Sequence, residues 1–259
     1  MLLPLVSTIE TTSHEKKGTA ETEVVLDGLL HGATTPTPAF DRSGNLWLAW
    51  VDDNHVFVGR LDDRQGTLAQ QTRVTQEAAT IDANGEARPK LSFGLNNEIF
   101  VAWTQRGKAP FTGDIMFSRS TNAGRTFTRP TTVNDDHLPI GHRFESLGVN
   151  QHGDIFLVWI DKRDLETSVA SGEPYDGAAL YYAWSHDNGQ SFSPNRKIKD
   201  HVCECCRIAL SFQEDGWPVL VWRDVLAGSI RDHAVVRFTG SDTFSDVRRV
   251  NRDAATSRI

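Results

Sequence analysis

The chain has 259 residues, of which 39% are hydrophobic, and a formal net charge of −7 at pH 7. This is enough apolar material for one buried core, so a single globular domain is the default expectation. Acidic and basic residues are mixed along the chain without a basic face, which argues against nucleic acid as a partner. No apolar run approaches the length of a membrane span, so we expect none.

Residues 1–33 are predicted to form an irregular lead-in with one outer strand. The tract from Thr8 to Thr22 is rich in Thr, Glu and Lys, a composition typical of segments without packed structure. Glu23 to Leu26 is the run with strand character. The first six residues are too short and lack the basic side chains of an export signal, so we expect no signal peptide in this chain.

From residue 34 onward, short β-branched and aromatic runs alternate with turns rich in Gly, Asn and Asp, a pattern typical of antiparallel strands. Four similar strands end at tryptophans, namely Trp50, Trp103, Trp159 and Trp222. Long repeats built from short strands indicate the blades of a β-propeller. We therefore predict an all-β propeller over residues 34–259, with at least four four-stranded blades at about 34–80, 85–135, 140–200 and 203–251.

Two turns share the form Ser-x-Asp/Asn-x-Gly-x-Thr/Ser-Phe, one from Ser120 to Phe127 and one from Ser185 to Phe192. In such a hairpin the Ser and Asx side chains bond backbone N–H groups and the Gly takes a positive φ. These turns resemble the Asp boxes, or BNR repeats, of the sialidase superfamily, over about Thr34 to Asn251. The resemblance implies a sialidase-like β-propeller, usually six-bladed in true sialidases, and an exported protein, periplasmic or extracellular.

Four visible blades would leave such a ring open. Three explanations fit the sequence: a four-bladed or N-terminally supplemented ring, an arc that a partner chain closes, or a chain that stops before its last blades. We favour the last, an incomplete six-bladed ring, because the residues after Val250 contain no further inner strand.

Arg88, Arg143 and Arg207 occupy equivalent positions before the tryptophans of three blades, where the innermost strand begins. That end of the inner strands borders the mouth of the central channel, so the three guanidinium groups are expected to converge there. Guanidinium keeps its charge and binds carboxylates in a bidentate manner. We predict a small anionic ligand or glycan at this mouth, with Arg163 and Arg223 as further ligand-binding residues. The alternative is that these residues form ion pairs between blades.

True sialidases bind the carboxylate of sialic acid with three arginines, the first in an Arg-Ile-Pro run. Arg143, followed later by the run from Asp161 to Asp164, resembles a loosened version of that pattern. The resemblance implies that Arg143 binds a carboxylate, that Arg163 supports it, and that Asp161 or Asp164 is the general acid of an exo-α-sialidase-like glycoside hydrolase. Arg-Ile-Pro itself is absent, as are the blades that would carry the nucleophilic tyrosine, so a complete sialidase mechanism is not expected.

All three cysteines lie within one short run, Cys203, Cys205 and Cys206, and His201 stands just before them. In an extended strand Cys203 and Cys205 would share one face and Cys206 would point to the other. Such a cluster predicts a soft metal ion, Cu(I) or Zn²⁺, with a local disulfide or three reduced thiols as alternatives. In this run the chain resembles exported bacterial sialidase-like propellers with a Cys-x-Cys-Cys motif. The alternative function is a non-enzymatic metal-binding or scaffold propeller.

Overall fold

The computed structural model describes residues 30, 32–62 and 66–250 of the chain. Nearly all of the predicted lead-in, including its expected strand from Glu23 to Leu26, lies outside the described residues. Within them the structure is built mainly of strands, with one α-helix, α1 (Arg163–Ser171), and one short 3-10 turn, η1 (Ala227–Ser229). No helix in this part of the chain is long and apolar enough to cross a membrane.

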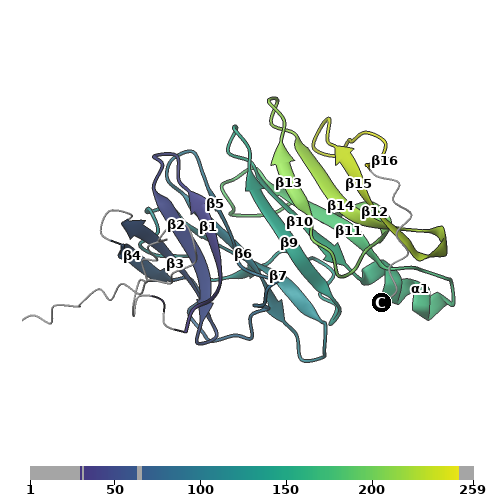
Figure 1. Ribbon diagram of the computed structural model, residues 1–259, viewed down its shortest axis with the longest axis horizontal. Helices are drawn as coiled ribbons and strands as arrows, with labels where there is room; N and C mark the ends of the chain where they lie inside the picture. The colour runs from purple at the N-terminus through teal and green to yellow at the C-terminus, as the bar shows by residue number, and fades with distance from the viewer. Residues whose placement is uncertain (1–29, 31, 63–65, 251–259) are drawn as a thin grey trace, which may run out of the picture.

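The strands form four antiparallel meanders that follow one another along the chain (Figure 1). The first consists of β1 (Thr34–Phe40), β2 (Leu46–Asp52), β3 (His55–Asp62) and β4 (Thr67–Arg73). The second consists of β5 (Lys90–Phe93), β6 (Ile99–Arg106), β7 (Gly113–Ser120) and β8 (Thr131–Thr132). The third consists of β9 (His142–Val149), β10 (Ile155–Asp161), β11 (Ala178–Ser185) and β12 (Arg196–Val202). The fourth consists of β13 (Ala209–Phe212), β14 (Pro218–Leu226), β15 (Ile230–Arg237) and β16 (Arg248–Arg249).

The third and fourth meanders are joined into one eight-stranded sheet. The link between them is the pairing of Val202 in β12 with Asp224 in β14. The prediction of an all-β fold made of four-stranded antiparallel units is confirmed.

The core lies between consecutive sheets, because the sheets pack face to face. One hydrophobic cluster joins β2 and β3 to β6, a second joins β6 and β7 to β10 and β11, and a third joins β10 and β11 to β14 and β15. The inner strands follow the same order, since β1 contacts β5, β5 contacts β9, and β9 contacts β13. The result is a fan of sheets whose first and fourth members lie at opposite ends (Figure 1).

Alternation along a strand explains how one sheet contributes to two clusters. In β6, Trp103 belongs to the cluster shared with the first sheet, whereas Phe100 and Ala102 belong to the cluster shared with the third. Successive side chains point to opposite faces, so a strand covered on both faces is a continuous apolar run. Trp103, Trp159 and Trp222 are each at most 1% exposed and each lies in a different cluster.

Each of the two Ser-x-Asx-x-Gly turns joins two strands of one sheet and packs against the preceding sheet. After β11, Ser185 Oγ accepts the N–H of Gly189 at 2.9 Å, and Asp187 accepts the N–H and the hydroxyl of Ser191 at 3.0 and 2.6 Å. Gly189 has a φ of +76°, and a Cβ there would lie 2.7 Å from Phe117 of the second sheet. Both the backbone conformation and the close approach therefore require glycine.

The equivalent turn after β7 has the same construction. Ser120 Oγ accepts the N–H of Gly124 at 2.9 Å. Gly124 also has a φ of +76°, and a Cβ there would lie 3.1 Å from Trp47 of the first sheet. Each turn thus packs against the preceding sheet and helps to set the spacing between neighbours.

Asp187 offers a test of how much such a turn contributes to stability. Burial acts to raise the pKa of Asp187, but hydrogen bonds from Ser191, Ser185 and Gln190 outweigh burial and hold it at about 2, against an ordinary 3.8. Because the folded-state pKa is depressed, this stabilisation is present above about pH 4 and is lost as the pH falls toward about 2. We expect Asp187→Asn to lower the free energy of unfolding by about 1–2 kcal/mol at neutral pH.

Urea denaturation at several pH values measures this effect, and the exposed Asp246 provides the matched control variant Asp246→Asn. The deficit of Asp187→Asn should shrink as the pH falls. A deficit that stays constant through the acid range contradicts the assignment.

Candidate functional site

Two of the three predicted entrance arginines meet at one aromatic ring. Arg143 is the second residue of β9, and Arg207 lies just before β13. Their guanidinium carbons lie 4.5 and 4.0 Å from the centre of the Phe144 ring, a range at which cations are attracted to an aromatic face. The third, Arg88, lies just before β5 and donates to the backbone oxygen of Gly85 at 2.9 Å.

A β-bulge in β9 positions the side chains around these arginines. The pairing register with β10 shifts so that Phe144 and Glu145 together stand opposite the single residue Trp159. Phe144 has a φ of +60°, which is uncommon for a residue other than glycine. Bulges redirect side chains and are frequent beside binding sites. Here the bulge turns Glu145 into the interior, where its exposed fraction is 3%.

Arg88 and Arg207 line the same cavity, which has a volume of about 260 Å³. Its lining also includes Glu86, Lys90, Phe144 and Glu145. Burial lowers the pKa of Lys90, the charge of Glu145 opposes this, and the charges of Arg88 and Arg207 lower it further. The cationic groups are therefore close enough to repel one another across this cavity.

Glu145 supplies a carboxyl group to the same cavity. Burial raises the pKa of Glu145, while the charge of Lys90 and the hydrogen bond from the Thr104 hydroxyl, at 2.8 Å, oppose the rise. Glu145 and Lys90 are not among the predicted site residues. The signal that could have found them is their position directly after the Arg88-Pro89 and Arg143-Phe144 pairs.

Arg143 lines a second cavity, of about 220 Å³, which is distinct from the cavity of Arg88 and Arg207. The lining of this cavity includes Phe111, Gly141, Ile160, Lys162, Glu204 and Cys205. The Phe111 side chain is 75% exposed, and its ring centre lies 6.0 Å from the Arg143 guanidinium carbon. Lys162 and Glu204 form an ion pair at 2.5 Å.

The charge of Arg143 is shared with a buried carboxylate. Asp82 Oδ2 accepts from Nε and Nη2 of Arg143, at 2.8 and 2.5 Å. Asp82 Oδ1 accepts from Nε and Nη2 of Arg106, at 3.0 and 2.8 Å. The Asp82 side chain is fully buried, whereas Arg106 and Arg143 are partly exposed. This arrangement matches the alternative of an ion pair between sheets, and a ligand role for Arg143 stays a prediction.

The structure separates the predicted acids from both cavities. Asp161 is fully buried and accepts from Trp159 Nε1 at 2.9 Å and from Arg163 Nη2 at 2.8 Å. Its neighbours Ile160 and Lys162 line the second cavity, so Asp161 points to the opposite face of the strand. Asp164 accepts the hydroxyl of Tyr181 at 2.9 Å, and Arg163 stacks on the Tyr181 ring at 4.3 Å.

His142 joins the same network as Asp161 and is not among the predicted site residues. Its Nδ1 donates to the backbone oxygen of Gly113 at 2.8 Å and its Nε2 lies 3.0 Å from Asp136. Burial lowers the pKa of His142, but the hydrogen bond with Asp136 and the charges of Asp161 and Asp136 outweigh it and raise the pKa. The network thus favours the protonated form of the histidine between the second and third sheets.

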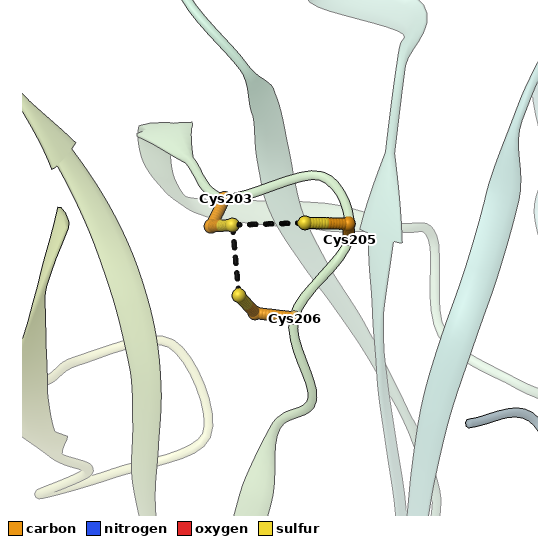
Figure 2. A group of neighbouring side chains, drawn as sticks. All are labelled: Cys203, Cys205 and Cys206. Carbon is orange, nitrogen blue, oxygen red and sulfur yellow. Dashed lines mark hydrogen bonds between the residues drawn. The ribbon is translucent and has the colours of Figure 1, made fainter. Parts of the chain in front are cut away.

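The three cysteines gather in a turn directly after β12 (Figure 2). Cys203 Sγ lies 2.8 Å from Cys206 Sγ and 3.5 Å from Cys205 Sγ. The expectation that Cys206 would point away from the other two is wrong, because the chain turns here, with the Cys206 N–H donating to the Cys203 oxygen at 3.3 Å. Cys203 is buried, Cys206 is partly buried, and Cys205 is exposed.

The three thiols differ in acidity. The hydrogen bond with Cys206 lowers the pKa of Cys203, burial opposes it, and contacts with Cys205 and the charge of Arg231 bring it to about 5. The hydrogen bond to Cys203 raises the pKa of Cys206, and burial raises that of Cys205. The contacts therefore make one thiol of the cluster more acidic and the other two less acidic.

Two other predicted residues lie beside this cluster with different contacts. His201 Nδ1 lies 3.1 Å from the backbone oxygen of Asp176, and its ring packs against Tyr175 at 4.6 Å. The group of mutually close potential metal ligands at this turn contains the three cysteines and not His201. Arg223 donates from Nε to the backbone oxygen of Arg231 at 3.3 Å, so it lies by the cysteines and lines neither arginine cavity.

No protein-family model matches the chain, and no curated protein matches it in sequence. Solved structures do match it. The Hadza microbial sialidase Hz136 aligns over 85% of this chain and 47% of its own, with 17% identity and a TM-score of 0.56. The α-L-arabinanase of Penicillium chrysogenum aligns over 89% and 70%, with 14% identity and a TM-score of 0.55. The NanB sialidase of Streptococcus pneumoniae aligns over 87% and 52%, with 8% identity and a TM-score of 0.55.

The chain has the fold of a sialidase-like β-propeller. The predicted β-propeller fold is confirmed. At these identities the similarity concerns the fold. The propeller chain spans about half the length of the two sialidases.

The ion pair at Asp82 gives the first test of this part of the propeller. Asp82→Asn leaves two guanidinium groups beside a neutral side chain in a buried position. Removing one partner of a buried pair costs about 3–5 kcal/mol, so we expect the free energy of unfolding to fall by about 3 kcal/mol. Chemical denaturation measures the loss, with Asp53→Asn at an exposed turn as the control. A loss equal to that of the control would show that Asp82 does not hold the sheets together.

The raised pKa of His142 gives the second test. Because the folded-state pKa is raised, the stabilisation is complete below the unfolded value of about 6.5 and is lost as the pH rises through the folded value. We expect Asp136→Asn to lower the pKa of His142 and to flatten this decline. NMR titration of the His142 ring and denaturation at several pH values measure both effects. An unchanged His142 pKa in Asp136→Asn contradicts the role of the carboxylate.

Proposed function

We propose that this propeller binds an acidic glycan at the cavity lined by Arg88, Lys90 and Arg207, and that it works outside the cytoplasm, in the periplasm or beyond. The observation that carries the proposal is the convergence of three cationic side chains on one cavity, from the entrances of the inner strands of the second and fourth sheets. Propellers bind their ligands at this kind of position, where loops from several blades meet.

The charge balance of the cavity favours an anion. Of its carboxyl groups, Glu86 pairs with Arg207, and Glu145 has a raised pKa because it is buried. Arg88 donates to the backbone oxygen of Gly85 rather than to either of these carboxyl groups, so its charge can act on an anion in the cavity. Guanidinium groups fixed by stacking, as Arg207 is on Phe144, are suited to bidentate binding of a carboxylate or sulfate.

The size of the cavity favours the end of a glycan chain. At about 260 Å³ it is smaller than the roughly 300–1,000 Å³ of sites for drug-sized ligands. The exposed ring of Phe111 in the second cavity offers an apolar surface for the next sugar unit. Among the solved neighbours is an ulvan lyase bound to a sugar of GlcA and Rha3S units, with a TM-score of 0.52.

The proposal is for binding and does not include hydrolysis. Glycoside hydrolysis uses a pair of carboxyl groups on either side of the scissile bond. Asp161 and Asp164, the two candidates for the acid, are held by Arg163, Trp159 and Tyr181. An activity assay with a fluorogenic sialoside is therefore expected to give no turnover.

Calorimetric titration with sialyllactose, an oligogalacturonate and neutral lactose tests the proposal. We expect the acidic sugars to bind, the neutral one not to bind, and added salt to weaken binding. Arg207→Ala should reduce affinity by roughly tenfold or more, since a charge-assisted hydrogen bond contributes about 1.5–3 kcal/mol. The control is Arg125→Ala, which removes the same charge from an exposed turn. Equal binding of lactose and the acidic sugars, or equal losses in the two variants, would reject the cavity as the site.

A further inference from the structure

We propose that Cys203, Cys205 and Cys206 form a three-coordinate thiolate site for a soft monovalent cation, Cu(I). None of the three thiols lines the cavity of Arg88, Lys90 and Arg207, and the proposal does not depend on glycan binding there. Its sulfur atoms all lie within 4.8 Å of one another, which is close enough for one ion to touch all three. Figure 2 shows the three side chains pointing toward a common centre from one turn.

The backbone holds this arrangement in place. The N–H of Cys203 donates to the oxygen of Arg223 in β14 at 2.8 Å, next to the pairing of Val202 with Asp224. The turn is therefore anchored to the fourth sheet at the point where β12 ends. A site with its ligands already gathered avoids the cost of ordering the loop when the ion binds.

The ligand set selects the class of metal. Thiolates are soft ligands that favour Cu(I) and Zn²⁺ over the hard cations Mg²⁺ and Ca²⁺. Structural Zn²⁺ almost always takes four protein ligands, whereas the described residues bring together three at this turn. The sequence offers His201 as a fourth ligand, but its Nδ1 contacts the backbone oxygen of Asp176 and its ring packs against Tyr175. Cu(I) can be bound by three sulfur ligands, so this ligand set suits Cu(I) better than Zn²⁺.

Nearby guanidinium groups would balance the charge of the loaded site. Three thiolates around one Cu(I) leave two negative charges. Arg231 in β15 acts electrostatically on Cys203 and Cys205, and its Nε and Nη1 are buried with no hydrogen-bond partner in the described part of the chain. Arg223 acts on Cys206 through a side-chain hydrogen bond. Buried donors without a partner are costly, and an anionic metal–thiolate group would offset that cost.

The site also has a route of entry. Cys205 is exposed and lines the cavity of about 220 Å³ that Arg143 and Phe111 share, while Cys203 is buried behind it. An ion can therefore reach the outer thiol first and pass to the inner two. Binding releases the thiol protons to solvent and leaves copper as Cu(I), so no oxidant or reductant is consumed.

Competition titration tests the proposal on the full chain. The protein, reduced and kept free of oxygen, is titrated with Cu(I) in the presence of the chromophoric chelator bicinchoninate. We expect one Cu(I) per chain and an X-ray absorption spectrum with sulfur ligands alone. Cys205→Ser should weaken binding by roughly 100-fold, and Arg231→Gln by roughly 10-fold. Since Cys205 is exposed, its variant keeps the test valid even if the variant at buried Cys203 fails to fold.

His201→Asn is the matched control and should leave Cu(I) affinity unchanged. A loss in His201→Asn as large as that in Cys205→Ser would overturn the three-sulfur set. Zn²⁺ bound more tightly than Cu(I) would overturn the choice of metal. Reduced protein that gives up all its Cu(I) to the chelator, together with a Cys203–Cys206 disulfide in protein isolated in air, would overturn the site as a whole.

Discussion

The structure depends on the burial of sheets on both faces. The middle strands of the second and third sheets contribute alternate side chains to two different clusters, as Trp103 and Phe100 do in β6, so the sheets pack as a series. Charged groups are excluded from these interfaces unless they are paired, because an unpaired buried charge is costly. They collect instead at the ends of the strands, where the chain enters each inner strand. The position of the candidate sites follows from this packing.

Two of the carboxylates buried between sheets are paired with guanidinium groups. Asp82 accepts hydrogen bonds from two guanidinium groups, and Asp161 accepts them from Arg163 and from the ring nitrogen of Trp159. Such groups are well suited to fix how neighbouring sheets sit relative to one another. The same residue types would serve a binding site, so the contacts of Arg143 are compatible with an ion pair between sheets and with ligand binding. Its neighbour Arg207 is paired only at an exposed carboxylate, that of Glu86, and keeps its stacked guanidinium at a cavity.

Much of the architecture could be predicted because its signals are local. The tryptophans, the Ser-x-Asx-x-Gly turns and the apolar runs report strands and turns within a few residues of one another. The position of Arg88, Arg143 and Arg207 before inner strands followed from that repeat. The partners could not be predicted, since Asp82 lies 61 residues before Arg143. The inward direction of the Glu145 side chain could not be predicted either, because it depends on a bulge in β9.

The cysteines show the same limit in another form. Strand periodicity placed Cys206 on the wrong face, since β12 ends at Val202 and a turn follows. At its last residue β12 pairs with a strand of the next sheet, which is a long-range feature. The sequence thus identified the reactive groups and could not give their relative geometry.

The packing of each Ser-x-Asx-x-Gly turn on the preceding sheet bears on how such a chain could have grown by gene duplication. Gly189 belongs to the third sheet, yet the ring that it accommodates, Phe117, belongs to the second. A copied segment that coincides with one sheet would carry a turn without its counterpart. A segment that runs from the middle of one sheet to the middle of the next would keep each turn together with the ring against which it packs.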